Sequence, residues 1–144
     1  MIRNATAEDI PFIIWCLQSM REEADFDVAN DPEYVSGCLE QLIDHPSFTA
    51  YIEEGKGVAF AVTQPTWYDA RPATYEQLLY VRPEYRSSSI APRLIRALIE
   101  DARIRGSKEI QAGSVTGFRE EALLGLYKRL GFEDYRGGVR LRLM

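Results

Sequence analysis

Apolar positions in the first third of the chain recur with helical spacing after one short strand pattern. Residues 2–6 predict the strand, and Thr6 with Asp9 three residues later suits the start of a helix. Apolar side chains then follow one face of that helix, at Ile10, Ile13, Ile14, Leu17 and Met20. A second helix is predicted within residues 31–45.

The middle of the chain has the pattern of β-strands. Residues 47–54 and 57–67 predict two strands that are joined by Gly55-Lys56-Gly57, a sequence suited to a hairpin turn. A third strand is predicted over residues 73–81, after a loop over residues 68–72. Together the three strands predict an antiparallel meander.

In the last third of the chain, helical and strand patterns of apolar residues alternate. An apolar stripe predicts a long amphipathic helix that ends at Gly106, with members at Ile90, Leu94, Ile95, Leu98, Ile99 and Ala102. A strand over 107–115, a helix over 118–130 and two short closing strands over 131–135 and 138–144 are expected next. The order of elements predicts an α+β fold in which helices cover both faces of one sheet.

Length and composition favour a single domain over residues 1–144, because a chain of 144 residues with 46% hydrophobic content can form one good core. Its longest apolar runs are far shorter than a membrane span, and its first residues lack the apolar segment of a signal peptide. We therefore expect a cytoplasmic protein. The two cysteines, Cys16 and Cys38, form no metal-binding pattern, so no metal site is expected.

The net charge of −5 conceals a strong asymmetry along the chain. Residues 1–81 carry 4 basic and 14 acidic side chains, whereas residues 82–144 carry 13 basic and 8 acidic ones. A basic second half suits an anionic ligand and an acidic first half suits a cationic one. An uneven scatter of surface charge would give the same counts.

One junction has the character of a phosphate-binding turn. A strand pattern ends at Val81, a loop of small residues opens at Arg86, and a helix follows in which Ser89 can cap the N-terminus and Pro92 falls in the first turn. Free N–H groups and the positive end of the helix dipole favour a phosphate there. An ordinary capped helix behind a polar loop explains the same residues.

The stretch LLYVRPEYRSSSIAPRLI resembles the acetyl-CoA-binding motif of the GNAT superfamily of N-acetyltransferases. In that motif a strand is followed by R/Q-x-x-G-x-G/A and a helix, and Arg86, Ser89 and Ala91 occupy the marked places. LYKRLGF resembles the second signature of the family, a helix that ends in Y-x-x-x-G-F, and IRNATAEDIPFI is similar to its usual opening. The resemblance implies the acyl-CoA N-acyltransferase fold, with a mixed and mostly antiparallel sheet.

The resemblance also implies the chemistry of the site. The cofactor would be acetyl-CoA, held by main-chain groups of Leu79, Tyr80, Val81, Arg86, Ser87, Ser88, Ser89, Ile90 and Ala91. Tyr127 would protonate the leaving thiolate, although a packing tyrosine has the same pattern. Glu76 is the candidate base, but strand alternation places it with Leu78 and Tyr80, on the opposite face from Leu79, unless a bulge redirects it. An exposed strand glutamate, or a water chain to an acidic residue, is the alternative.

The acceptor would be an amine of a small molecule or a peptide. Acidic and aromatic residues suit such an acceptor, namely Glu22, Glu23, Asp25, Asp27, Asp31, Trp67 and Tyr68, unless they are only solvated loop residues. Ser89 replaces the usual central glycine and Glu120 a frequent asparagine, so a non-catalytic CoA-binding or interaction module is the second hypothesis. We expect no membrane or nucleic-acid partner, since the basic excess is modest. The resemblance allows a homodimer.

Overall fold

The sheet contains five strands in the order β1-β2-β3-β4-β5 in the computed structural model, which describes residues 1–24, 28–113, 119–135 and 139–143. The strands are β1 (Ile2–Asn4), β2 (Phe48–Glu53), β3 (Gly57–Thr66), β4 (Asp69–Val81) and β5 (Ile110–Gln111). The first four pair antiparallel, and β5 joins β4 in parallel through two residue pairs only. The predicted α+β fold with a mixed, mostly antiparallel sheet is confirmed.

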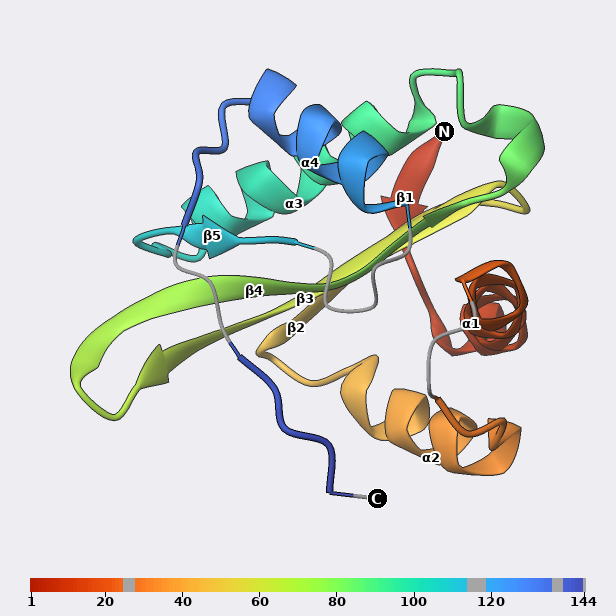
Figure 1. The fold of residues 1–144 in the computed structure, drawn as a ribbon. Coiled ribbons are helices and arrows are strands. Elements are labelled where there is room, and N and C mark those ends of the chain that lie inside the picture. The colour runs from red at the N-terminus through yellow and green to blue at the C-terminus, as the bar shows by residue number, and fades with distance from the viewer. Residues whose placement is uncertain (25–27, 114–118, 136–138, 144) are drawn as a thin grey trace.

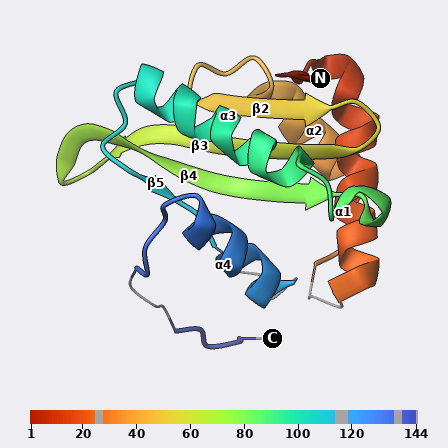
Figure 2. The same ribbon diagram turned by 90° about the horizontal axis from the view of Figure 1, so that it is seen from above.

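Two pairs of helices cover the two faces of this sheet (Figure 1). The helices are α1 (Ile10–Ala24), α2 (Pro32–Leu42), α3 (Ile90–Ile104) and α4 (Glu120–Arg129), with short 3-10 turns η1 (Ala7–Asp9) and η2 (Pro83–Tyr85). On one face, α1 and α2 bury residues such as Ile13 against Ile52 and Val58. On the other face, α3 crosses β2, β3 and β4, and α4 lies beside it (Figure 2).

The start of the chain folds as its polar pattern predicts. The carboxylate of Asp9 accepts a hydrogen bond from the main-chain N–H of Thr6 at 2.8 Å and pairs with both terminal nitrogens of Arg3. Asp31 caps α2 by accepting from the N–H of Tyr34 at 3.1 Å. Both helices therefore begin where a carboxylate can satisfy an N–H group that has no partner within the helix.

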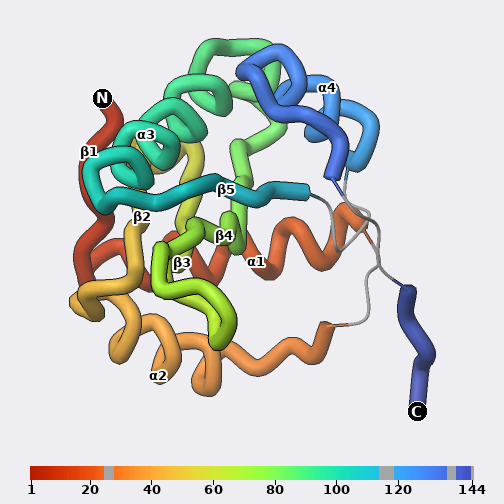
Figure 3. The backbone as a smooth tube through the Cα atoms, turned by 90° about the vertical axis from the view of Figure 1, so that its left-hand side faces the viewer, coloured from red at the N-terminus to blue at the C-terminus, as the bar shows by residue number. Residues whose placement is uncertain are grey.

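Other elements differ from the sequence prediction in their extent. The expected loop over residues 68–72 lies almost wholly in β4, because the hairpin turns at Trp67 and Tyr68 and pairing resumes at Asp69. A strand was expected over residues 107–115, of which 114 and 115 lie outside the described residues; of residues 107–113, only Ile110 and Gln111 pair in the sheet. The described residues of the two expected closing strands, 131–135 and 139–143, form no strand, and residues 139–143 run outside the sheet (Figure 3). Only five strands, rather than seven, are therefore seen in the described chain.

Candidate active site at the open edge of β4

The candidate base lies beside a β-bulge in β4. Leu78 opposes Phe60 and Glu76 opposes Ala61, so Gln77 is an extra residue without a partner in β3. The extra residue reverses the alternation, and Glu76 lies on the same face as Ala61 and Leu79, beneath α3 and α4. Simple alternation, which placed Glu76 with Leu78 and Tyr80, is therefore wrong, and the bulge is the physical reason.

Main-chain groups of β4 are left open beyond the point where β5 ends. In an antiparallel ladder the bonded pairs alternate, and the N–H of Arg82 donates to the carbonyl of Lys56 at 2.8 Å. Tyr80 therefore bonds to β3, whereas the main-chain groups of Leu79 and Val81 point to the other edge. The side chain of Tyr80, which is 1% exposed, lies in the core beneath α1. Leu79 and Val81, but not Tyr80, can thus offer N–H groups to a ligand.

The end of α4 fixes the position of Tyr127. Gly131 adopts φ 102°, the N–H of Phe132 donates to the carbonyl of Tyr127 at 3.0 Å, and the N–H of Gly131 donates to that of Lys128 at 3.1 Å. These are the two bonds of a Schellman motif, which a glycine at this position permits. The rings of Phe132 and Tyr127 also pack with centroids 5.2 Å apart. The residues Gly131 and Phe132 therefore orient the tyrosine that they follow.

Glu76 and Tyr127 come together between β4 and α4. Burial raises the pKa of Glu76 from its ordinary value of 4.5 to about 7, against the opposing effect of hydrogen bonds from Tyr127 and from the main chain of Gly113. Burial, together with the charge of Glu76, also raises the pKa of Tyr127 above its ordinary value. The pair thus combines a carboxyl group that can exchange a proton near neutral pH with a hydroxyl that stays protonated.

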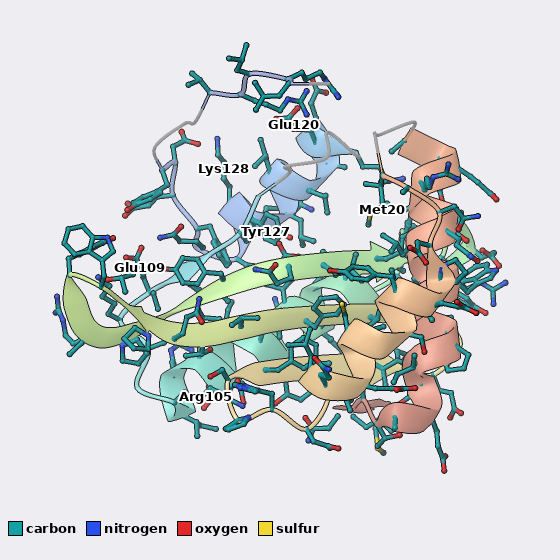
Figure 4. All side chains as sticks on the ribbon, turned by 90° about the horizontal axis from the view of Figure 1, so that it is seen from below. Met20, Arg105, Glu109, Glu120, Tyr127 and Lys128 are labelled. Atoms are coloured by element: carbon teal, nitrogen blue, oxygen red, sulfur yellow. The ribbon has the colours of Figure 1, made fainter. Side chains whose placement is uncertain are left out.

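The pair faces a cavity of about 890 Å³. Its walls come from β4, α3, the segment around β5, α4 and residues 131–135, and Met20 of α1 also lines it. In Figure 4, Tyr127 lies between α4 and β4, while Glu109 and Met20 lie on opposite sides of it. The volume is ample for a thioester and an amine, and it lies where β4 and β5 cease to pair.

The predicted phosphate loop keeps several N–H groups free without using glycine. Among the described residues the only non-glycine with positive φ is Arg119, so every residue from Arg86 to Ala91 keeps φ below zero. The N–H groups of Arg86, Ser88 and Ile90 are engaged within the loop. For Ser87, Ser89 and Ala91, the described chain offers no hydrogen-bond acceptor. Three donors at the N-terminus of α3 are thus available to an anion.

Side chains in the loop have other roles than expected. Ser88, and not Ser89, provides the hydroxyl at the start of α3, since its Oγ accepts from the N–H of Ile90 at 3.3 Å. Ser89 Oγ accepts instead from Nε of Arg93 at 3.1 Å. The guanidinium of Arg86 is directed toward the end of β4, where its Nε donates to the carbonyl of Val81 at 2.9 Å. The sequence analysis missed Arg93, although its place one turn into the helix marks it as a candidate phosphate contact.

The residues expected around the acceptor do not form one cluster. Trp67 and Tyr68 are 94% and 68% exposed at the tip of the β3–β4 hairpin, at the opposite end of the sheet from α1 (Figure 1). Glu22 and Glu23 belong to α1 and Asp31 caps α2, while Asp25 and Asp27 lie outside the described residues. The aromatic pair is therefore separated from the acidic residues that the sequence grouped with it.

The described part of the chain contains neither a metal-binding cluster nor a membrane-spanning helix. Its residues include no group of three or more His, Cys, Asp or Glu that could hold a metal ion. No helix within residues 1–24, 28–113, 119–135 and 139–143 is long and apolar enough to cross a membrane. Glu120, where the family pattern often has asparagine, is exposed at the start of α4 (Figure 4).

Comparison with known proteins identifies the family of the chain. The family model described as "Acetyltransferase (GNAT) family" matches residues 13–132. A predicted acetyltransferase with acetyl-CoA from Clostridium acetobutylicum has a TM-score of 0.79 at 19% identity, over 99% of this chain and 96% of that one. A search of curated proteins by sequence gave no significant match.

Two other solved structures show how widely this fold is shared. An aminoglycoside acetyltransferase from an uncultured soil metagenomic sample has a TM-score of 0.73 at 21% identity, over 100% of this chain and 98% of that one. A transcriptional regulator from Bacillus halodurans has a TM-score of 0.79 at 18% identity, over 99% of each chain. At these identities the likeness establishes the fold alone.

Proposed function

Because the chain belongs to the acetyltransferase (GNAT) family, we propose that it is an acetyl-CoA-dependent N-acetyltransferase that acts on a primary amine of a small molecule or a peptide. The single observation that carries this proposal is the contact between Glu76 and Tyr127 in the cavity where β4 and β5 separate. A bulge and a helix terminus bring these two groups together from residues far apart in the sequence.

Coenzyme A would bind along the open edge of β4. The N–H groups of Ser87, Ser89 and Ala91 suit its pyrophosphate, and the residues present therefore fit an anionic cofactor. The free N–H groups of Leu79 and Val81 suit the polar groups of the arm that carries the thioester, one of them serving as donor to the developing oxyanion. Bound acetyl-CoA supplies the activated acetyl group, and the side chains around it transfer protons.

Glu76 would act as the base. Its pKa of about 7 lets the carboxylate take a proton from an ammonium group at neutral pH, after which the amine nitrogen attacks the thioester carbonyl carbon. The C–N bond forms, the C–S bond breaks, and the sulfur takes its proton from the hydroxyl of Tyr127. A second proton would pass from the amine nitrogen to Tyr127 and restore its hydroxyl. The first proton would pass from Glu76 to water.

The second candidate function is a non-catalytic CoA-binding or interaction module of the same fold. The observation that favours it is the serine at the centre of the phosphate loop, together with the absence of glycine in residues 86–91. The two functions differ in whether bound acetyl-CoA is turned over. That the protein works in the cytoplasm, without a nucleic-acid or membrane partner, stays a prediction, as do the single domain and the homodimer.

Release of free CoA thiol in the presence of a panel of amines tests the proposal. The panel comprises polyamines, aminoglycosides, amino acids and lysine peptides, each assayed with the parent chain and with Glu76→Gln. We expect at least one acceptor to release thiol at a rate that rises with pH to a plateau, with a midpoint near the pKa of Glu76, about 7. If acetyl-CoA binds but no amine reacts, the non-catalytic function replaces this one.

A further inference from the structure

One side chain of α1 reaches across to the phosphate loop. The carboxylate of Glu23 accepts a hydrogen bond from the hydroxyl of Tyr80 at 2.7 Å and pairs with the guanidinium of Arg86 at 2.8 Å. The three residues come from α1, β4 and the loop before α3, so this contact joins three elements. The side chains of Glu23 and Arg86 are 29% and 16% exposed, which sets them apart from the solvated ion pairs of the surface.

The guanidinium of Arg86 is held on more than one side. Its Nε donates to the carbonyl of Val81 at 2.9 Å, and its central carbon lies 5.4 Å from the ring centroid of Tyr80. A planar fork that bonds a carbonyl with one nitrogen and a carboxylate with another leaves the side chain little freedom. The first residue of the phosphate loop is therefore anchored through its side chain, and the N–H groups of Ser87, Ser89 and Ala91 stay available.

The same end of α1 also borders the reaction cavity. Met20, one turn before Glu23, is 6% exposed and lines the cavity. The helix thus contacts the cavity through one side chain and the phosphate loop through another. A change at the end of α1 would be transmitted to both, since each contact is made by a packed or ion-paired side chain.

We propose that Glu23 is a positioning residue for the cofactor loop, an inference that rests on the proposed function. By holding the Arg86 guanidinium against Val81 and Tyr80, it keeps the free N–H groups of Ser87 and Ser89 turned outward for the pyrophosphate. Without the carboxylate, the guanidinium loses the ion pair with Glu23, and the loop loses a side-chain contact that anchors it to α1. Removing the carboxylate should weaken the binding of the cofactor and leave the chemical step unchanged, because Glu23 touches neither Glu76 nor Tyr127 in the described contacts.

Glu23→Gln tests this role, with Glu22→Gln as the matched control on the preceding, exposed residue of the same helix. We expect Glu23→Gln to raise the Kd for acetyl-CoA roughly tenfold, the effect of losing a hydrogen bond to a charged group. At saturating acetyl-CoA the turnover should match that of the parent within about twofold, since the reacting groups are unchanged. Glu22→Gln should bind acetyl-CoA with the Kd of the parent.

Amide hydrogen exchange without ligand gives a second readout. We expect residues 86–91 to exchange faster in Glu23→Gln than in the parent, with Arg86→Lys giving a similar effect and the double variant adding little to either. Unchanged exchange in the loop, or an unchanged Kd in a parent that binds acetyl-CoA, overturns the positioning role and leaves the proposed function standing. If the parent binds no acetyl-CoA, the proposed function falls, and the exchange data alone decide whether Glu23 holds the loop.

Discussion

Replacing Glu76 by glutamine should stabilise the protein while it abolishes most of its activity. Burial raises the pKa of this carboxyl from 4.5 to about 7, so the folded protein holds the ionised form at a cost. At about 1.4 kcal/mol for each pKa unit, the ionised carboxylate costs the fold on the order of 3 kcal/mol above pH 7. Glutamine has the same size and does not ionise, so that cost disappears.

The sign of the effect with pH follows from the raised pKa. Between pH 4.5 and about 7 the folded state keeps a proton that the unfolded state has lost, so the free energy of unfolding of the parent falls as the pH rises. Below 4.5 the carboxyl is protonated in both states, and the parent should match the variant. Denaturant unfolding at pH 4 and pH 8, compared for the two chains, measures the difference.

Glu109→Gln is the control, because it makes the same chemical change elsewhere on the wall of the cavity. At pH 8 we expect the free energy of unfolding of Glu76→Gln to be about 1–3 kcal/mol higher than that of the parent. The substitution should also lower kcat/KM roughly 100- to 10,000-fold. Equal stability of parent and Glu76→Gln at both pH values would show that the carboxylate is solvated. Unchanged kcat/KM would remove Glu76 from the mechanism and favour a water chain.

Three further substitutions probe the other parts of the site. Tyr127→Phe should lower kcat roughly 10- to 1000-fold in steady-state assays while acetyl-CoA affinity stays within a few-fold, whereas a packing tyrosine would leave turnover intact. Ser89→Asp should weaken acetyl-CoA binding in a calorimetric titration because a carboxylate repels the pyrophosphate, and Ser89→Gly should bind at least as well as the parent. Gly131→Ala should cost about 1–2 kcal/mol in denaturant unfolding and reduce turnover, since alanine resists positive φ and Tyr127 is held by this turn; equal stability would contradict that role.

Local patterns were sufficient where an element depends on its own residues. The stripe from Ile90 to Ala102 predicted α3, and Gly106, which adopts φ 74°, ends it as expected. Thr6 marked the start of the first helix, and the range predicted for the second begins at its capping residue, Asp31, because capping is a local interaction. These features lie within a few residues of each other in the sequence, and no tertiary contact is needed to produce them.

The site itself depended on contacts that the sequence does not display. The bulge at Gln77 is a mismatch in length between β3 and β4, and alternation within β4 alone cannot reveal it. The sequence predicted Ser89 as the capping residue of α3, but the hydroxyl that accepts from the N–H of Ile90 belongs to Ser88. The path of the main chain after η2 determines which hydroxyl lies near that N–H group. The contact of Glu23 with Arg86 joins residues 63 positions apart, and only the packing of α1 against the sheet brings them together.

Titration of the parent chain with acetyl-CoA, followed by calorimetry and by thermal unfolding, tests the central claim most directly. Acetyl-CoA and CoA should bind and raise the melting temperature, with about 2.7 kcal/mol of stabilisation at a ligand concentration one hundredfold above Kd, while ATP and NAD should not. Ser89→Asp should show a smaller rise at the same concentration. No heat of binding and no shift of the melting temperature at millimolar acetyl-CoA would contradict the assignment of the loop, the cavity and the reaction together.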